Sequence, residues 1–269
     1  MSDTGTPDVQ SVIASLRRRV MTVVFMIDVS GSVKGERLAA VNSAIKNAVS
    51  ALKKYDEGSA TVEIQVAIME FASSAVWRTP VPEPVSEYRY DEITRTGGGT
   101  NYSNAFKSLD EKLSSGAFAF MGAEARSYSP ALILLTDGRP SDPLIYGEAL
   151  DRLKKTACFR RTVKAGVAIG EGASSNECLR ALAEFTGDKG TVFSTGDIRT
   201  LDGLIERTVL NGVDLSARRP LEVVAPSNDV PPPMPLEWED PEIPGFEDID
   251  WERDFPPFNP AGSEMEAMV

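Results

Sequence analysis

The sequence contains no histidine, and only two of its 269 residues are cysteines, Cys158 and Cys178. Without histidine there is no Ser-His-Asp or Cys-His nucleophile pair, no histidine general base and no histidine-containing zinc or iron site. The two cysteines are too few for a disulfide framework and lack the spacing of a zinc site, so we expect free thiols in a cytoplasmic protein. Conventional enzyme classes are therefore poorly supported.

Long hydrophobic runs are also missing. No stretch of about 18 apolar residues could form a transmembrane helix, and no GxxxxGK[ST] phosphate loop occurs. In the N-terminal flank, residues 1–19, acid precedes the apolar patch and Arg17, Arg18 and Arg19 follow it, which is the wrong order for a secretory signal. These absences predict a protein with no membrane partner.

The net charge of −12 is concentrated in one part of the chain. Residues 228–269 contain 12 acidic residues and one basic residue, which leaves the remainder at −1. Nucleic-acid binding is therefore disfavoured for residues 228–269 and unsupported elsewhere in the chain.

Short apolar runs alternate with helical patterns over residues 20–213. Two of the runs, TVVFMI and ALILLT, are apolar throughout, which is typical of parallel strands covered on both faces. The sequence predicts one α/β domain with a doubly wound, mostly parallel, Rossmann-like sheet, helices on both faces, and a ligand site at the carboxyl ends of the strands. Strands are expected at 20–27, 60–72, 74–79, 130–137, 161–170 and 190–194, and helices at 35–55, 101–121, 144–157, 176–187 and 197–210.

The tail, residues 214–269, differs in composition. Nine of the chain's 18 prolines lie in residues 228–269, and LEWED (236–240) is echoed 13 residues later by IDWER (249–253). A plain acidic run usually serves only to keep a protein soluble. Aromatic residues in a flexible acidic peptide instead favour docking to another protein. The predicted partner-binding residues are Trp238, Phe246, Trp251, Phe255 and Phe258.

Three segments place oxygen-bearing side chains at the predicted carboxyl edge. They are DVSGS, with Asp28, Ser30 and Ser32; TGGGTNYSNA, with Thr100; and LLTDGRPSD, with Asp137. Each alone is more typical of a helix cap, a turn or a flexible loop than of a ligand site. Together, two aspartates at neighbouring strand ends would repel each other unless a cation or partner lay between them. The all-oxygen set suits a hard divalent cation such as Mg²⁺.

In this order and at these separations, the three segments resemble the metal-ion-dependent adhesion site of von Willebrand factor type A (VWA) domains. The resemblance covers about residues 20–213. It implies that Asp28, Ser30, Ser32, Thr100 and Asp137 bind Mg²⁺ or Mn²⁺, and that a Glu or Asp of a protein ligand takes the open position on the metal.

Within that family, FMIDVSGSVKGERLAAVNSAI, GGGTNYSNAF and LILLTDGRPSD resemble bacterial cytoplasmic TerY-type proteins of tellurite-resistance and stress loci. That subgroup is associated with a protein kinase and a metal-dependent protein phosphatase, which implies an adaptor. Two alternatives stay open: an adaptor of a chelatase-type ring ATPase, and a metal-dependent hydrolase or phosphoryl-transfer enzyme. The enzyme would need a general base beside the metal, and no candidate set is apparent. Whether a tail carboxylate occupies the site also stays open.

Overall fold

A sheet of seven strands lies at the centre of the computed structural model, which describes residues 18–114 and 128–217. The strand order is β3-β2-β1-β5-β6-β7, and β4 pairs with β2. The strands are β1 (Arg19–Asp28), β2 (Val62–Phe71), β3 (Ala75–Trp77), β4 (Glu83–Pro84), β5 (Ala131–Thr136), β6 (Val163–Ile169) and β7 (Val192–Thr195).

The strand pairings are mostly parallel, as predicted. β1 lies between β2 and β5 and is parallel to both, and β5, β6 and β7 continue the parallel arrangement. The short strands β3 and β4 are antiparallel to β2. Because the parallel strands all end at the same edge, the polar residues that follow β1 and β5 come to one side of the sheet.

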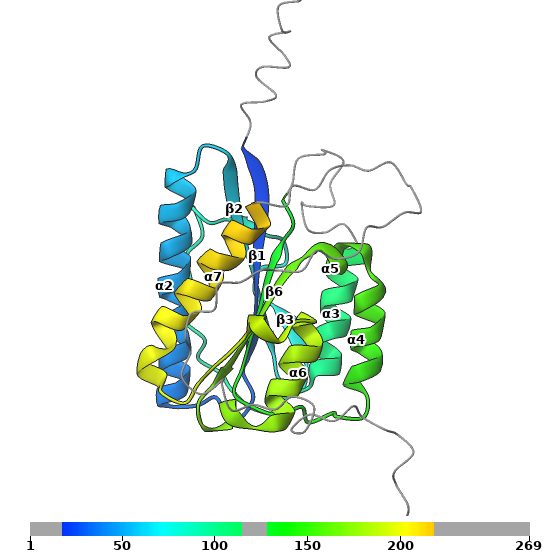
Figure 1. Ribbon diagram of the computed structural model, residues 1–269. Helices are drawn as coiled ribbons and strands as arrows, with labels where there is room; N and C mark the ends of the chain where they lie inside the picture. Colours follow the sequence, from blue (N-terminus) through cyan, green and yellow to red (C-terminus); the bar gives the residue numbers. More distant parts are fainter. Residues whose placement is uncertain (1–17, 115–127, 218–269) are drawn as a thin grey trace, which may run out of the picture. The chain divides into compact units, whose positions relative to one another are not determined.

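Two helix layers cover the sheet (Figure 1). One layer contains α2 and α7, which pack against each other; the other contains α3, α4, α5 and α6. The helices are α2 (Glu36–Gly58), α3 (Tyr102–Ser114), α4 (Tyr146–Lys155), α5 (Ala157–Arg161), α6 (Asn176–Thr186) and α7 (Leu201–Ala217), with 3-10 turns η2 (Glu171–Ser174), η3 (Lys189–Thr191) and η4 (Ile198–Thr200). The α/β fold class is thereby confirmed.

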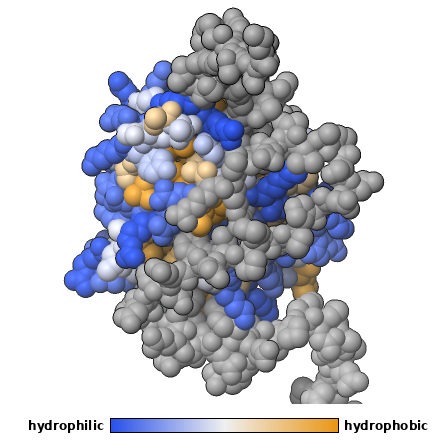
Figure 2. Space-filling model, turned by 45° about the horizontal axis from the view of Figure 1, so that its top comes forward, coloured by the Kyte–Doolittle hydropathy of each residue, from blue (hydrophilic) through white to orange (hydrophobic). Residues whose placement is uncertain are grey.

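The core sits on both faces of the central strands. Every residue of β5 is buried, and Phe25 of β1 is flanked across the sheet by Ile68 and Ile133. Burial on both faces explains why these strands are apolar throughout rather than alternating. On the face shown in Figure 2, by contrast, the coloured residues are mostly hydrophilic, with a smaller hydrophobic area among them.

Some element boundaries differ from the sequence-based expectation. Helix α4 begins at Tyr146 rather than at 144, and Leu144 and Ile145 lie before it with exposed fractions of 80% and 53%. The extended backbone of Thr156 ends α4, although the expected helix continued to 157, and the short helix α5 that follows was not expected. The pairing of β4 was not expected. Helix α3 is described to Ser114, and the rest of the predicted helix lies outside the described residues.

The two ends of the chain are described only in part. Helix α7 continues to Ala217, beyond the 213 expected as the end of the domain, and the five predicted aromatic anchors of the tail lie outside the described residues. The domain boundaries therefore stay predictions. Within residues 18–114 and 128–217, none of the helices has the length and apolar character needed to cross a membrane.

The two thiols are buried, and burial raises the pKa of both. The pKa of Cys158 is about 12, although the charges of Arg161 and Lys164 act to lower it. The pKa of Cys178 is also about 12, and the carboxylates of Asp28 and Asp137 add to the effect of burial. The reactive thiolate is thus scarce at neutral pH.

We expect both cysteines to resist alkylation by iodoacetamide in the native protein at pH 8 and to react fully in denaturant. Mass spectrometry of the modified chain checks this expectation. Rapid native labelling of either thiol would contradict the burial described here.

Candidate functional site

Two aspartates meet where β1 and β5 end. Asp28 is the last residue of β1, and Asp137 directly follows β5. The two strands are parallel neighbours, with Ile27 opposite Leu135, so the carboxylates reach the same edge of the sheet. The structure therefore brings together the two aspartates that the sequence placed in the site.

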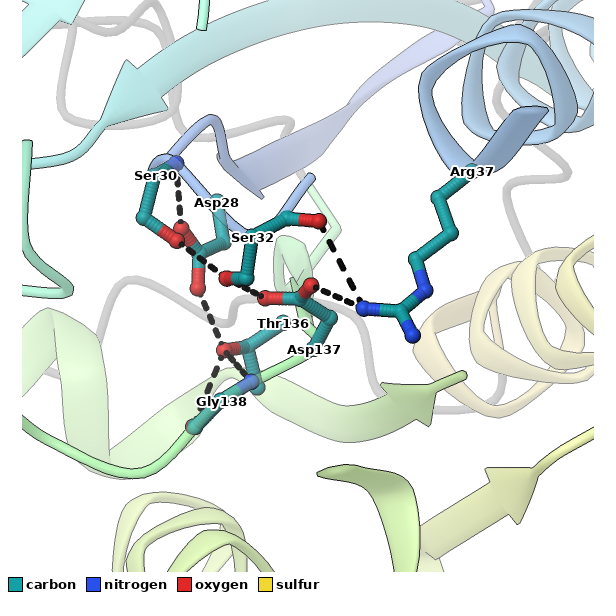
Figure 3. Close-up of polar contacts among 7 residues, drawn as sticks. All are labelled: Asp28, Ser30, Ser32, Arg37, Thr136, Asp137 and Gly138. Carbon is teal, nitrogen blue, oxygen red and sulfur yellow. Dashed lines mark hydrogen bonds and ion pairs between the residues drawn. The ribbon is translucent and has the colours of Figure 1, made fainter. Parts of the chain in front are cut away.

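The loop after β1 joins them through serine hydroxyls (Figure 3). The backbone N–H of Ser30 donates to Asp28 Oδ1 at 2.8 Å, and Ser30 Oγ and Ser32 Oγ are hydrogen-bonded at 3.1 Å. Ser32 Oγ then donates to Asp137 Oδ1 at 2.7 Å. Ser30 and Ser32 thus connect the two aspartates through hydrogen bonds, with the backbone N–H of Ser30 as the link to Asp28.

The glycine loop brings Thr100 to the same place. Gly97 N–H donates to Val29 O at 2.9 Å and Gly31 N–H donates to Gly98 O at 3.0 Å, so the second segment pairs with the first through its backbone. Thr100 is 6% exposed, and its Oγ1 lies 3.4 Å from the position that a Cβ on Gly138 would take. Its hydroxyl therefore lies beside the residue that follows Asp137.

One glycine of this loop is required by geometry. Gly98 has a φ of +78°, and a Cβ added to it would lie 2.4 Å from Ser73 Oγ. A side chain at this position would be strained by its backbone and would also clash. The close approach of the TGGGT segment to the turn after β2 therefore depends on a glycine at position 98.

Burial makes the negative charge of Asp28 costly. Asp28 is only 1% exposed, and this burial raises its pKa; hydrogen bonds from Thr136 and Ser30 act in the opposite direction, and the charge of Asp137 adds to the increase. The site thus holds a carboxylate that a neighbouring positive charge would stabilise.

Sequence reasoning missed three residues that organise the site. Thr136 Oγ1 donates to Asp28 Oδ2 at 2.6 Å, and Arg37 Nη1 lies 3.3 Å from Asp137 Oδ2. Asp142 accepts the N–H groups of Tyr102 at 3.1 Å and Ser103 at 2.7 Å, so it caps the start of α3 and ties the third segment to the second. The sequence offered a signal for two of them: Thr136 ends an apolar strand, and Asp142 ends the LLTDGRPSD segment. No sequence pattern pointed to Arg37.

The chemistry of the site is that of oxygen donors. Within the described ranges, no group of three or more Asp, Glu or Cys side chains could hold a metal ion. The two aspartates are accompanied instead by the hydroxyls of Ser30, Ser32 and Thr100. An all-oxygen set of this kind fits a hard divalent cation, and Ser32 is exposed, so the set opens to solvent.

A sequence model of the von Willebrand factor type A domain matches residues 22–207. Among curated proteins, no sequence matches the chain. Among solved structures, the pilus adhesin SpaC from Lactobacillus rhamnosus GG has a TM-score of 0.57 and 11% identity, covering 74% of this chain and 30% of the adhesin.

Two further structures have the same fold. A von Willebrand factor type A protein from Catenulispora acidiphila gives a TM-score of 0.54 and 18% identity, with 72% of this chain and 43% of that one covered. Proximal thread matrix protein 1 from the mussel byssus was solved with zinc in its MIDAS (metal-ion-dependent adhesion site) motif. It has a TM-score of 0.50 and 17% identity, covering 74% of this chain and 47% of the mussel protein. The chain thus spans less than half of the length of each of these three structures.

Metal-free protein gives a test of the buried charge. Because the pKa of Asp28 is raised on folding, the native state binds more protons than the unfolded state between the ordinary and the raised value, and stability falls as pH rises through that window. We expect Asp28→Asn to be more stable than the wild type at neutral pH and to lose this advantage as the pH falls toward 4.

Urea unfolding in EDTA at several pH values measures this difference. Ser50→Ala, at an exposed position of α2 where the hydroxyl donates to the backbone O of Lys46, serves as a control whose difference from the wild type is constant with pH. A less stable Asp28→Asn at neutral pH would mean that the hydrogen bonds to the carboxylate outweigh its burial.

Proposed function

Because the chain belongs to the von Willebrand factor type A family, we propose that it is a non-enzymatic adaptor that binds a partner protein through a divalent cation. The observation that carries the proposal is the convergence of three loops at the carboxyl edge, where Ser32 Oγ donates to Asp137 Oδ1 at 2.7 Å and Ser30 joins Asp28 to Ser32. These hydrogen bonds keep the oxygens of Asp28, Ser30, Ser32 and Asp137 in one cluster.

The proposed ligands are Asp28, Ser30, Ser32, Thr100 and Asp137. The unfavourable burial of the Asp28 carboxylate next to Asp137 supports the assignment, because a cation would offset both charges. When bound, that cation would supply an open coordination position for a Glu or Asp of the partner. We propose Mg²⁺ or Mn²⁺ because the donors are all oxygens; the zinc reported in the mussel protein makes Zn²⁺ a necessary comparison.

An adaptor is favoured over an enzyme by the residues around the proposed metal. The chain has no histidine to act as a base, and both thiols have a pKa of about 12, which leaves them weak nucleophiles. Asp142 is turned to the start of α3, where it accepts two backbone N–H groups. These features support binding rather than chemistry at this edge.

For the biological setting, we propose a cytoplasmic bacterial stress or defence system that includes a protein kinase and a metal-dependent protein phosphatase. The support is the resemblance of the three ligand-bearing segments to TerY-type proteins. An adaptor of a chelatase-type ring ATPase is the alternative. Affinity purification from the native cell separates the two, since each predicts a different enzyme among the captured proteins.

Calorimetric titration with Mg²⁺, Mn²⁺ and Zn²⁺ tests the metal site. We expect Asp28→Ala and Asp137→Ala to weaken binding by at least about 100-fold, because each removes a carboxylate ligand. Asp151→Ala, which removes an exposed carboxylate on α4, should bind as the wild type does. Equal titrations for all four proteins would refute the proposed site.

The tail supplies a second proposed contact. Its two tryptophans lie in the repeated LEWED and IDWER frames, and two linked weak contacts raise the overall affinity for a partner. We expect Trp238→Ala combined with Trp251→Ala to leave unfolding and metal affinity unchanged and to lose a protein from the affinity-purified set.

Met265→Ala with Met268→Ala is the matched control, since it removes apolar side chains of the same tail outside the repeat. Loss of folded protein in the tryptophan variant would show a structural role. Capture of an unchanged set of partners would contradict docking by the tail.

A further inference from the structure

Each segment that bears a proposed ligand contains an exposed basic residue or lies within two residues of one. Lys34 lies two residues after Ser32, and Arg139 lies two residues after Asp137. Arg95 lies two residues before Gly97, whose N–H donates to Val29 O in the first segment. Ser141 N–H donates to Thr100 O at 2.9 Å, so the third segment is also bound to the second and all three basic residues lie on loops in contact with one another. We name Lys34, Arg95 and Arg139 the basic rim.

Few acidic residues on these segments oppose the rim. Apart from the two site aspartates, residues 29–37, 94–100 and 138–141 contain four basic residues and one acidic residue, Glu36. The whole chain, by contrast, has 28 basic and 40 acidic residues. Asp142 is buried against the start of α3. Asp91 and Glu92 lie next to Ile93, whose N–H donates to Asn42 Oδ1 in α2. A divalent cation would offset the site aspartates and leave an excess of positive charge here.

The fourth basic residue, Arg37, has a different role. Its Nη1 contacts Asp137 Oδ2 at 3.3 Å, and its side chain lies over Gly170, where an added Cβ would come within 2.9 Å of Arg37 Nε. Gly170 also has a φ of +74°, so the position is suited to glycine for two reasons. Arg37 orients a proposed ligand, and its substitution would disturb the metal site itself.

We propose that the basic rim makes this site selective for an acidic segment of the partner, in which further carboxylates flank the one bound at the metal. This inference rests on the proposed function and adds the chemistry of the partner to it. Because the three exposed cations lie on three different loops, they would be available to carboxylates on either side of the one at the metal. Exposed charge pairs contribute little individually and are weakened by salt, so the selectivity is a sum of small terms that depends on ionic strength.

The test uses the full chain and two synthetic probes. One is a capped 12-residue Gly/Ser peptide with a single central glutamate. The other has the same length and carries three more glutamates in total, distributed over both sides of the central one. NMR or fluorescence titration in saturating Mg²⁺ measures both affinities. We expect the four-glutamate peptide to bind about tenfold more tightly at low salt, with most of this preference lost at 0.5 M salt.

The variant Lys34→Gln/Arg95→Gln/Arg139→Gln removes the rim without touching a proposed ligand. It should bind Mg²⁺ and the single-glutamate peptide as the wild type does, and lose the preference for four glutamates. The control Lys54→Gln/Lys155→Gln/Arg160→Gln removes the same charge from exposed positions at the ends of α2 and α4 and in α5. It should retain the preference.

Two results would overturn the inference: equal affinity of the wild type for both peptides, or the same loss of preference in the rim and control variants, which would indicate net charge alone. Failure of the proposed function has a separate signature, absence of Mg²⁺ binding to the wild type. The rim variant and its control also differ in charge position rather than amount, so a difference between them identifies the rim.

Discussion

The parallel pairing of β1 with β5 is the constraint on which the rest of the site depends. It fixes Ile27 opposite Leu135 and so brings Asp28 and Asp137 to one edge, at the ends of two strands whose side chains are buried on both faces. Burial removes much of the hydration of Asp28, and the charge of Asp137 adds to the cost of ionising it. The sheet thus fixes the positions of the two aspartates and makes the negative charge of Asp28 energetically costly.

The surrounding polar groups offset part of that cost. Thr136 Oγ1 donates to one oxygen of Asp28, the N–H of Ser30 donates to the other, and Ser32 Oγ donates to Asp137. Yet burial still dominates, since the pKa of Asp28 is raised despite these bonds. Arg37 supplies one fixed positive charge on the outer side of Asp137. A divalent cation bound at the proposed site would offset the remaining cost and so stabilise the native state.

Much of this architecture could be predicted from the sequence because the signals were strong and local. Continuous apolar strands alternating with amphipathic helices indicated the parallel sheet, and the topology then implied that DVSGS, TGGGT and LLTDGRPSD meet at one edge. The contacts that hold those segments together were not predictable. The capping of α3 by Asp142 spans 39 and 40 residues, and the ion pair of Arg37 with Asp137 spans 100. Such pairs depend on loop geometry, which no residue pattern within one segment specifies.

The same reasoning explains where the sequence-based boundaries were wrong. Ile145 and Tyr146 both donate to Asp142 O, so the chain turns before α4 begins, although its apolar pattern starts at Leu144. Since Asp142 also caps α3, one residue ends the ligand loop, starts two helices and fixes the distance between the second and third segments. Asp142 therefore shapes this edge without being one of the proposed metal ligands. The loops that carry the basic rim are held together by backbone hydrogen bonds, from Gly31 N–H to Gly98 O and from Ser141 N–H to Thr100 O, so their exposed side chains are not needed for that contact.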